Sequence, residues 1–262
     1  MAVDKHELEY KDADGTRFVG HLAHPQGADK GGAAKLPGVL VFHAFWGCTD
    51  HEKEKADELA KNGYVALAVD LYGDGKVLKA REEAAGNMTP LVSDRPNKLL
   101  PRLKASFEAL ASLPYVDQEK IGCIGYCFGG LCALDSARQK IGVKAAVSFH
   151  GTLKSIPEAE NTPIDAAIAI HHGDADSHIP MDQCLVGMRF SSSRFTPLTQ
   201  AIMEELRARG ADWQFIHHAG AKHAFTEPKA DSLGFPGIGY CAKADRRSWV
   251  HTIDFLNEKL KH

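Results

Sequence analysis

The chain has 262 residues, 44% of them hydrophobic, and its 31 Lys and Arg residues almost balance its 34 Asp and Glu residues, for a formal net charge of −3. This length predicts one domain spanning residues 1–262, and because no basic block is present we expect no nucleic-acid partner. The N-terminus has no apolar signal core, and no run approaches the ~20 apolar residues of a membrane span, so we expect a cytoplasmic protein without membrane partners.

The cysteines are scattered along the chain without the spacing of a disulfide framework. A protein of this size can build an adequate core and does not need covalent staples. We therefore expect six free thiols, most of them buried: Cys48, Cys123, Cys127, Cys132, Cys184 and Cys241.

The first predicted elements form an antiparallel hairpin. Residues 8–10 and 17–22 have the pattern of strands and flank a turn signal at Asp14-Gly15. The apolar run 37–42 then predicts a buried strand.

A capping box predicts the start of a helix. Thr49 is followed three residues later by Glu52, and Asn62-Gly63 is a typical helix end. Residues 64–69 predict the next strand. Four apolar residues at helical spacing then predict a long helix that covers the sheet: Leu99, Leu103, Phe107 and Leu110.

The second half of the chain alternates short apolar runs with amphipathic stretches. The predicted strands are 121–124, 143–149, 166–171 and 213–217, and the predicted helices are 202–209 and a C-terminal helix carrying Trp249, Ile253, Leu256 and Leu260. This alternation is typical of an α/β fold. We expect a mostly parallel sheet with helices on both faces and an antiparallel hairpin at its beginning.

One cysteine has the sequence context of a nucleophile. Cys127 lies at the centre of Gly-Tyr-Cys-Phe-Gly-Gly (125–130), directly after an apolar strand and before a helix-like stretch. A nucleophile elbow is a sharp strand-to-helix turn that requires small residues two positions either side, and Gly125 and Gly129 meet this requirement. The alternative interpretation is a buried thiol beside glycines that ease helix packing.

Two later loops offer an acid and a base in the chain order that such an elbow requires. Asp176, preferred here over Asp174, follows the strand 166–171, and His223 follows the strand 213–217. Both loops lie at the carboxyl ends of strands, where open α/β sheets place their sites. The alternatives are a turn-capping carboxylate for Asp176 and a surface histidine for His223.

These segments resemble the dienelactone hydrolase family of the α/β-hydrolase superfamily. The matching segments are residues 43–47, 70–72, 125–130, 173–180 and 223–225. The resemblance implies an α/β-hydrolase fold and a catalytic triad of Cys127, Asp176 and His223. It also implies an oxyanion hole formed by the backbone N–H groups of Phe45 and Phe128, which agrees with the usual positions of these donors.

The chain departs from the family pattern at two positions, and a third position has an uncertain match. Ala44 replaces a glutamate that helps to deprotonate the thiol, so activation is expected to depend on His223. Glu227 replaces an arginine that binds the substrate carboxylate, and a negative charge there disfavours an anionic lactone such as dienelactone. Arg81 corresponds to a second carboxylate-binding arginine of the family, or else it is a solvated helix residue.

Other candidate residues follow strands or occur in pairs. Trp46, Tyr72 and His150 each follow a strand and are expected to line the substrate pocket, with ordinary packing as the alternative. The pairs His171-His172 and His217-His218 consist of strand neighbours that point to opposite faces, so we expect no metal site there. The sequence has neither a phosphate-binding loop nor a dinucleotide fingerprint, so we expect no cofactor.

The sequence therefore predicts a cofactor-independent hydrolase of small carboxylic esters or lactones that forms a thioester on its cysteine. Two alternatives remain: a hydrolase of another electrophile such as a phosphoester, and a non-catalytic binding or thiol-redox protein on the same fold. The expected partner is a small-molecule substrate, and the expected assembly is a monomer or homodimer.

Overall fold

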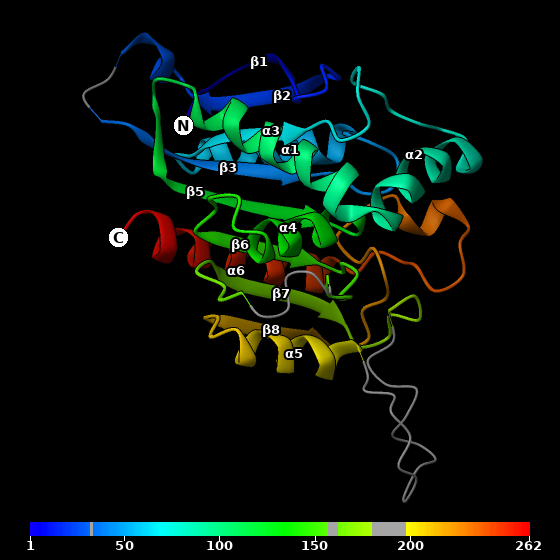
Figure 1. Cartoon of the computed structure of the whole chain (residues 1–262). Helices are drawn as coiled ribbons and strands as arrows, with labels where there is room; N and C mark the ends of the chain where they lie inside the picture. Colours follow the sequence, from blue (N-terminus) through cyan, green and yellow to red (C-terminus); the bar gives the residue numbers. More distant parts are fainter. Residues whose placement is uncertain (32–33, 157–161, 180–197) are drawn as a thin grey trace, which may run out of the picture.

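The computed structural model describes residues 1–31, 34–156, 162–179 and 198–262. Within them one sheet of eight strands has the order β1-β2-β4-β3-β5-β6-β7-β8 (Figure 1). The strands are β1 (Val3–Lys11), β2 (Arg17–Pro25), β3 (Leu36–Phe42), β4 (Val65–Val69), β5 (Val116–Tyr126), β6 (Ala145–Phe149), β7 (Ala167–Gly173) and β8 (Trp213–His218). Strand β2 is antiparallel to both β1 and β4, and all other neighbouring strands are parallel.

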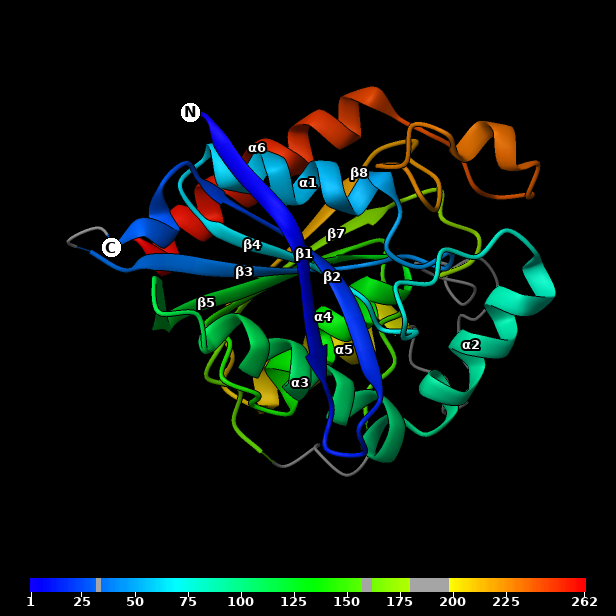
Figure 2. The ribbon, with the colours of Figure 1, turned by 90° about the horizontal axis from the view of Figure 1, so that it is seen from above.

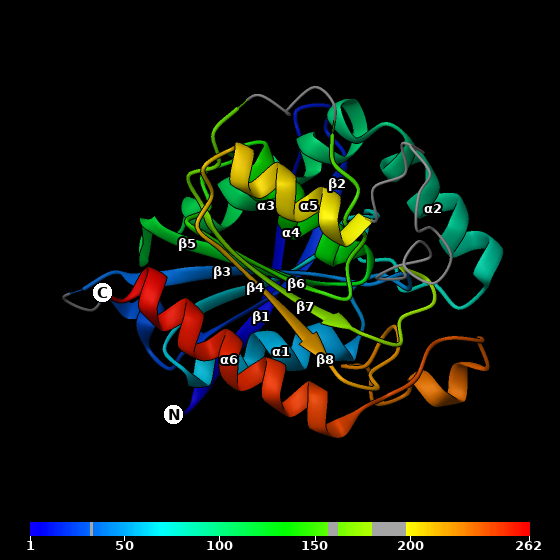
Figure 3. The same ribbon diagram turned by 90° about the horizontal axis from the view of Figure 1, so that it is seen from below.

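Helices cover both faces of this sheet. Figures 2 and 3 show α1 and α6 on one face and α3, α4 and α5 on the other, whereas α2 stands beyond one end of the strands. The helices are α1 (Asp50–Lys61), α2 (Arg81–Ser93), α3 (Leu100–Ala111), α4 (Phe128–Arg138), α5 (Leu198–Ala208) and α6 (Ala242–Leu260). The predicted fold class, with its N-terminal hairpin and mostly parallel sheet, is confirmed.

The predicted boundaries differ most from the structure at β1 and β5, which begin at Val3 and Val116 instead of residues 8 and 121, and by one residue at the long helix. Leu99 lies in a short π-helical turn, Arg95–Leu99, and α3 begins at Leu100. The capping box of α1 is present: the side chain of Thr49 accepts a hydrogen bond from the backbone N–H of Glu52, and the side chain of Glu52 accepts one from the backbone N–H of Thr49. None of the helices within the described residues is both long and apolar enough to cross a membrane.

The core has two layers because strand side chains alternate between the faces. On β3, Val39 and Val41 pack with α1 and α6, whereas Leu40 and Phe42 pack with α3 and α4. All four side chains are fully buried. The strand β3 is therefore apolar at nearly every position, as expected for a parallel strand covered on both sides.

A buried ionic network joins the π-helical turn to α4 and α5. Asp135 lies 3.2 Å from both Arg95 and Arg138, and Glu205 lies 2.7 Å from Arg138 and 2.8 Å from Arg209. The exposed fractions of these five side chains do not exceed 9%. The arginines also donate to backbone carbonyls of the neighbouring loops, among them Leu153 and Thr162. Removing one charged side chain from such a buried network leaves its partners without compensation and destabilises the fold.

The turn between β5 and α4 brings three segments of backbone into contact. Cys127 has φ 53° and ψ −110°, a conformation rare outside glycine. A Cβ atom at Gly125 would overlap the carbonyl of Gly129, and one at Gly129 would overlap the carbonyl of Phe42. The two glycines therefore allow the close approach that the sequence predicts for an elbow.

We expect the Gly129→Ala variant to lose roughly 3 kcal/mol of unfolding free energy or more, because the added methyl group meets rigid backbone. Chemical denaturation measures this loss. Gly86→Ala in α2 is the matched control, because its Cβ would meet open space. That variant should gain about 0.5–1 kcal/mol from helix propensity. Equal stability of Gly129→Ala and the wild type would contradict the proposed close packing of the turn.

Candidate active site

The three residues predicted as nucleophile, base and acid form one hydrogen-bonded chain. Cys127 Sγ lies 3.2 Å from His223 Nε2, and His223 Nδ1 lies 2.8 Å from Asp176 Oδ2. The three side chains come from the turn after β5, the loop after β7 and the loop after β8. They meet because parallel strands end at the same edge of the sheet.

The loop after β7 directs Asp176, and not Asp174, toward the histidine. Oδ1 of Asp176 accepts hydrogen bonds from the backbone N–H groups of His178 and Ile179, each at 2.9 Å. Burial opposes ionisation, but the hydrogen bond and charge of His223 and the bond from Ile179 outweigh it and lower the pKa of Asp176. Asp174 is exposed and accepts the backbone N–H of Gly220 instead.

Backbone hydrogen bonds fix the position of His223, and its side chain has a raised pKa. Its N–H and C=O groups bond to Gly237 and Gly239, at 3.3 and 3.0 Å. Burial opposes the charged imidazolium. The attraction of Cys127 and the bond to Asp176 outweigh that effect and raise the pKa of His223 to about 10. This histidine therefore lies between a sulfur and a carboxylate, both within hydrogen-bond distance.

Two backbone amides beside Cys127 are available for an oxyanion. Phe128 is the first residue of α4, so its N–H has no partner within that helix. Phe45 lies in the loop after β3, and no described residue accepts a hydrogen bond from its N–H. The position of both donors is the one predicted for an oxyanion hole.

The expectation that Tyr72 lines the pocket needs correction. Its side chain is buried, its hydroxyl donates to the carbonyl of Phe45 at 2.9 Å, and its ring stacks on Phe128. Tyr72 is absent from the pocket lining. Tyr72 therefore contacts Phe45 and Phe128 on the side away from the pocket, and it holds these two residues in position.

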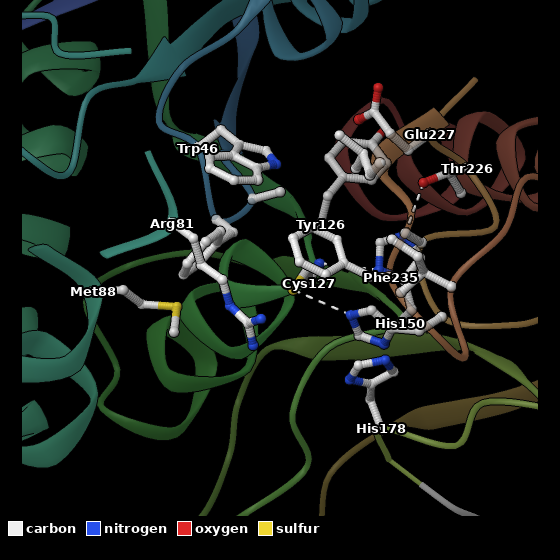
Figure 4. A pocket seen from close by; sticks show the side chains of 16 residues that line it. Trp46, Arg81, Met88, Tyr126, Cys127, His150, His178, Thr226, Glu227 and Phe235 are labelled. Carbon is white, nitrogen blue, oxygen red and sulfur yellow. Dashed lines mark hydrogen bonds between the residues drawn. The ribbon is translucent and has the colours of Figure 1, made fainter. Parts of the chain in front are cut away.

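A pocket of about 240 Å³ opens in front of Cys127, and its walls are mostly apolar. Figure 4 shows Trp46, Arg81 and Met88 on one side of Cys127 and the histidines on the other. The predicted lining residues Trp46, Arg81 and His150 all border this pocket. Arg81 comes from α2, and its guanidinium lies 5.1 Å from the centre of the Phe235 ring.

Besides bordering the pocket, His150 forms two hydrogen bonds that could not be predicted from the sequence. Its Nδ1 accepts the backbone N–H of Cys127 at 3.1 Å, so Nε2 carries the proton and donates to Thr226 Oγ1 at 2.8 Å. Burial, together with repulsion from His223, lowers the pKa of His150 well below its ordinary value. This neutral ring links the turn that carries the cysteine to the loop that carries the base.

The carboxylate missing at Ala44 is not replaced by one that contacts the sulfur. The acid that bonds to the loop of Ala44 is Glu52 of α1, which accepts the N–H of Ala44 at 3.2 Å and both the N–H and hydroxyl of Thr49. Burial raises the pKa of Glu52. Glu52 therefore holds the early loop in place, and among the described residues the side chain that contacts the sulfur of Cys127 at hydrogen-bond distance is His223.

The paired histidines have separate partners. His171 bonds to His218 at 3.1 Å, whereas His172 bonds to the carbonyl of Ile179 at 2.8 Å. The described cysteines other than Cys127 are free, and three of them are buried while Cys241 is partly exposed. Two residues named in the sequence analysis lie outside the described residues: Cys184, and Pro180 at the end of the segment 173–180.

Comparison with known proteins gives four findings. Residues 18–260 match the model of the dienelactone hydrolase family. The uncharacterized Caenorhabditis elegans protein K02A2.1 is 44% identical over 173 residues, which are 64% of this chain and 98% of that protein. Protein usf of Aquifex pyrophilus is 27% identical and covers 94% of this chain and 96% of its own length. A solved structure, a dienelactone hydrolase-like promiscuous phosphotriesterase from metagenomic libraries, has a TM-score of 0.86 and 32% identity over 99% of both chains.

Proposed function

The chain belongs to the dienelactone hydrolase family, and we propose that it hydrolyses small carboxylic esters or lactones through a thioester on Cys127. Membership of this hydrolase family favours an enzyme over a binding or thiol-redox protein on the same fold. The observation that carries the mechanism is the unbroken contact from Cys127 Sγ through His223 to Asp176.

In the proposed reaction the sulfur of Cys127 attacks the substrate carbonyl carbon, and its proton is held by His223. The N–H groups of Phe45 and Phe128 stabilise the negative charge on the carbonyl oxygen. When the carbon–oxygen bond breaks, His223 gives its proton to the leaving alcohol. It then takes a proton from water, which attacks the thioester and releases the acid and the thiol. Asp176 keeps the imidazole oriented and stabilises its charged form.

The pocket supports a small and mainly apolar substrate. Its volume of about 240 Å³ is below the roughly 300–1,000 Å³ that is usual for ligand pockets, and most of its exposed lining surface is apolar, although several histidines, Arg81 and Glu227 also line it. Arg81 borders one wall and Glu227 another. Substrates with an anionic group would meet attraction and repulsion in the same cavity, so dienelactone itself is not the substrate that we favour.

Phosphotriesters are the second candidate substrates. The solved relative with a TM-score of 0.86 and 32% identity is named a promiscuous phosphotriesterase. A phosphotriester also has a neutral electrophilic centre with one oxygen on which charge develops, so the same amides and the same sulfur could serve it.

We further propose a single domain over residues 1–262, because one sheet connects the first strand to β8 and the family match covers residues 18–260. A cytoplasmic location and a monomeric or homodimeric assembly are parts of the same proposal. Light scattering of the purified protein distinguishes one copy from two and would reveal any larger assembly.

The experiment that tests the function is a turnover panel of 4-nitrophenyl acetate, simple lactones and phosphotriesters, before and after alkylation with iodoacetamide at about pH 6.5. Peptide mass analysis locates the label. The proposal predicts ester or lactone turnover that disappears in proportion to the alkylation of Cys127. Full activity of a protein fully alkylated at Cys127 would disprove the mechanism, and turnover confined to phosphotriesters would favour the second candidate.

The carboxylate of the proposed triad has a matched control in the same loop. We expect Asp176→Asn to lower kcat/KM by roughly 10²–10⁴-fold, because the amide no longer fixes the charged imidazole. Asp174→Asn changes an exposed carboxylate two residues away and should alter kcat/KM by no more than about twofold. Steady-state kinetics measure both, and a larger loss in Asp174→Asn would contradict the assignment.

A further inference from the structure

Glu227 lies on a wall shared by two cavities. It borders the pocket of about 240 Å³ that contains Cys127, and also a second cavity of about 290 Å³. Trp46 and Leu233 border both cavities as well. In Figure 4 the carboxyl end of Glu227 is directed away from Cys127. A group bound by this carboxyl would therefore be separated from the carbonyl that the sulfur attacks.

The carboxyl group of Glu227 has no close cationic partner among the described residues. Its side chain is 26% exposed, and the nearest basic atom is Nδ1 of His51 at 3.9 Å. Burial lowers the pKa of His51 to about 4, so this ring is neutral at physiological pH. The Nε2 atom of His51, whose side chain is only 8% exposed, also has no hydrogen-bond partner among the described residues.

The charges that face Glu227 are mostly negative. Glu52 and Glu54 come from α1 and Asp245 from α6. The cations of this region are Lys229 on an exposed loop and Lys55 of α1, which acts on His51 and Asp245. The first turn of α1 would favour an anion, but Asp50 and Glu52 already occupy it. The second cavity is thus a negatively charged extension of the catalytic pocket.

The shared wall also contains an aromatic ring, the indole of Trp46, which stacks with Phe235. The indole of Trp46 borders both cavities, and an ammonium group over such a ring is stabilised by the ring's negative face. A neighbouring carboxylate adds a direct charge attraction. Aromatic face and carboxylate together are suited to a positively charged nitrogen and not to a second anion.

We propose that Glu227 makes this enzyme prefer esters that carry a cationic nitrogen over neutral esters of the same shape. The proposal rests on the ester hydrolase function given above and names a substrate class for it. The nitrogen occupies the cavity beyond Trp46, while the scissile carbonyl lies at Cys127.

The preference should depend on pH in a defined direction. Burial, and then repulsion by Glu52, raise the pKa of Glu227 to about 7. A carboxyl is charged above its pKa, so the preference for a cation is full at about pH 8.5 and is lost as the pH falls through 7. His223 and Cys127 act on both members of a substrate pair, so their titration cancels in the ratio of kcat/KM values.

The test uses pairs of esters that differ only in charge. Acetylthiocholine and 3,3-dimethylbutyl thioacetate place the charge on the leaving group, and the 4-nitrophenyl esters of 4-(trimethylammonio)butanoate and 5,5-dimethylhexanoate place it on the acyl group. We expect kcat/KM for the cationic member of at least one pair to be roughly tenfold higher, or about 1.4 kcal/mol. In Glu227→Gln this ratio should fall to near one, and in the exposed α3 control Glu108→Gln it should not change.

The outcomes separate this proposal from the function on which it rests. Turnover of neutral esters that requires Cys127, with ratios near one in both pairs, would overturn the role of Glu227 and leave the esterase intact. A high ratio that persists in Glu227→Gln would also overturn it. If no ester of the panel is hydrolysed, the proposed function itself fails.

Discussion

The Cys127→Ala variant is expected to lose ester hydrolysis by roughly 10⁴-fold or more, because no other group can form the covalent intermediate. Cys127 is only partly buried, and its replacement leaves the hydrogen bonds of its backbone N–H to Phe149 and His150 intact. The variant should therefore fold normally, which circular dichroism and thermal unfolding can verify. Initial rates with 4-nitrophenyl acetate measure the loss.

A matched thiol replacement controls for changes unrelated to the nucleophile. Cys241 is also partly exposed, and it precedes α6. We expect Cys241→Ala to retain activity within about twofold, as is usual for a substitution away from a site. Equal rates in Cys127→Ala and the wild type would remove the cysteine from the mechanism.

The Asp135→Ala variant is expected to lose about 3–5 kcal/mol of unfolding free energy. Removal of this carboxylate leaves the buried Arg95, which is 9% exposed, without an acidic partner among the described residues, and leaves Arg138 with Glu205 alone. Denaturant titration followed by circular dichroism measures the change. Because the network lies between α4 and its neighbouring segments, the loss should appear in global stability.

The control for this variant is an ion pair on the surface. Asp165 lies 2.9 Å from Lys140, but their side chains are 77% and 38% exposed. Water screens such a pair, so Asp165→Ala should cost no more than about 1 kcal/mol. If the two variants lose the same stability, the buried network contributes no more than an ordinary surface pair.

The part of the site that follows from local chain geometry could be predicted from the sequence. The elbow requires small residues on both sides of Cys127, and the acid and base follow strands whose ends share one edge of the sheet. The choice of Asp176 over Asp174 depends on how one short loop turns its backbone N–H groups, and the structure has Asp176 beside His223. The fold was predictable for a similar reason, since buried parallel strands leave long apolar runs.

Other features depend on contacts between distant segments and left no local signal. Helix α2 has no apolar stripe and contains Pro90, so its sequence does not have a helical pattern. Tyr72 was expected in the pocket because it follows a strand, yet its hydroxyl reaches back to Phe45. The link from His150 to Cys127 and Thr226 joins residues far apart in the sequence, and only the folded chain reveals it.

The most direct measurement is a rapid acid quench of the enzyme during its first turnover of 4-nitrophenyl acetate, followed by digestion and mass analysis of the peptides. The mechanism predicts one acetyl group on the peptide that contains Cys127, and none on the same peptide of Cys127→Ala. Steady hydrolysis with the acetyl group on another residue, or on none throughout the time course, would contradict a thioester at Cys127.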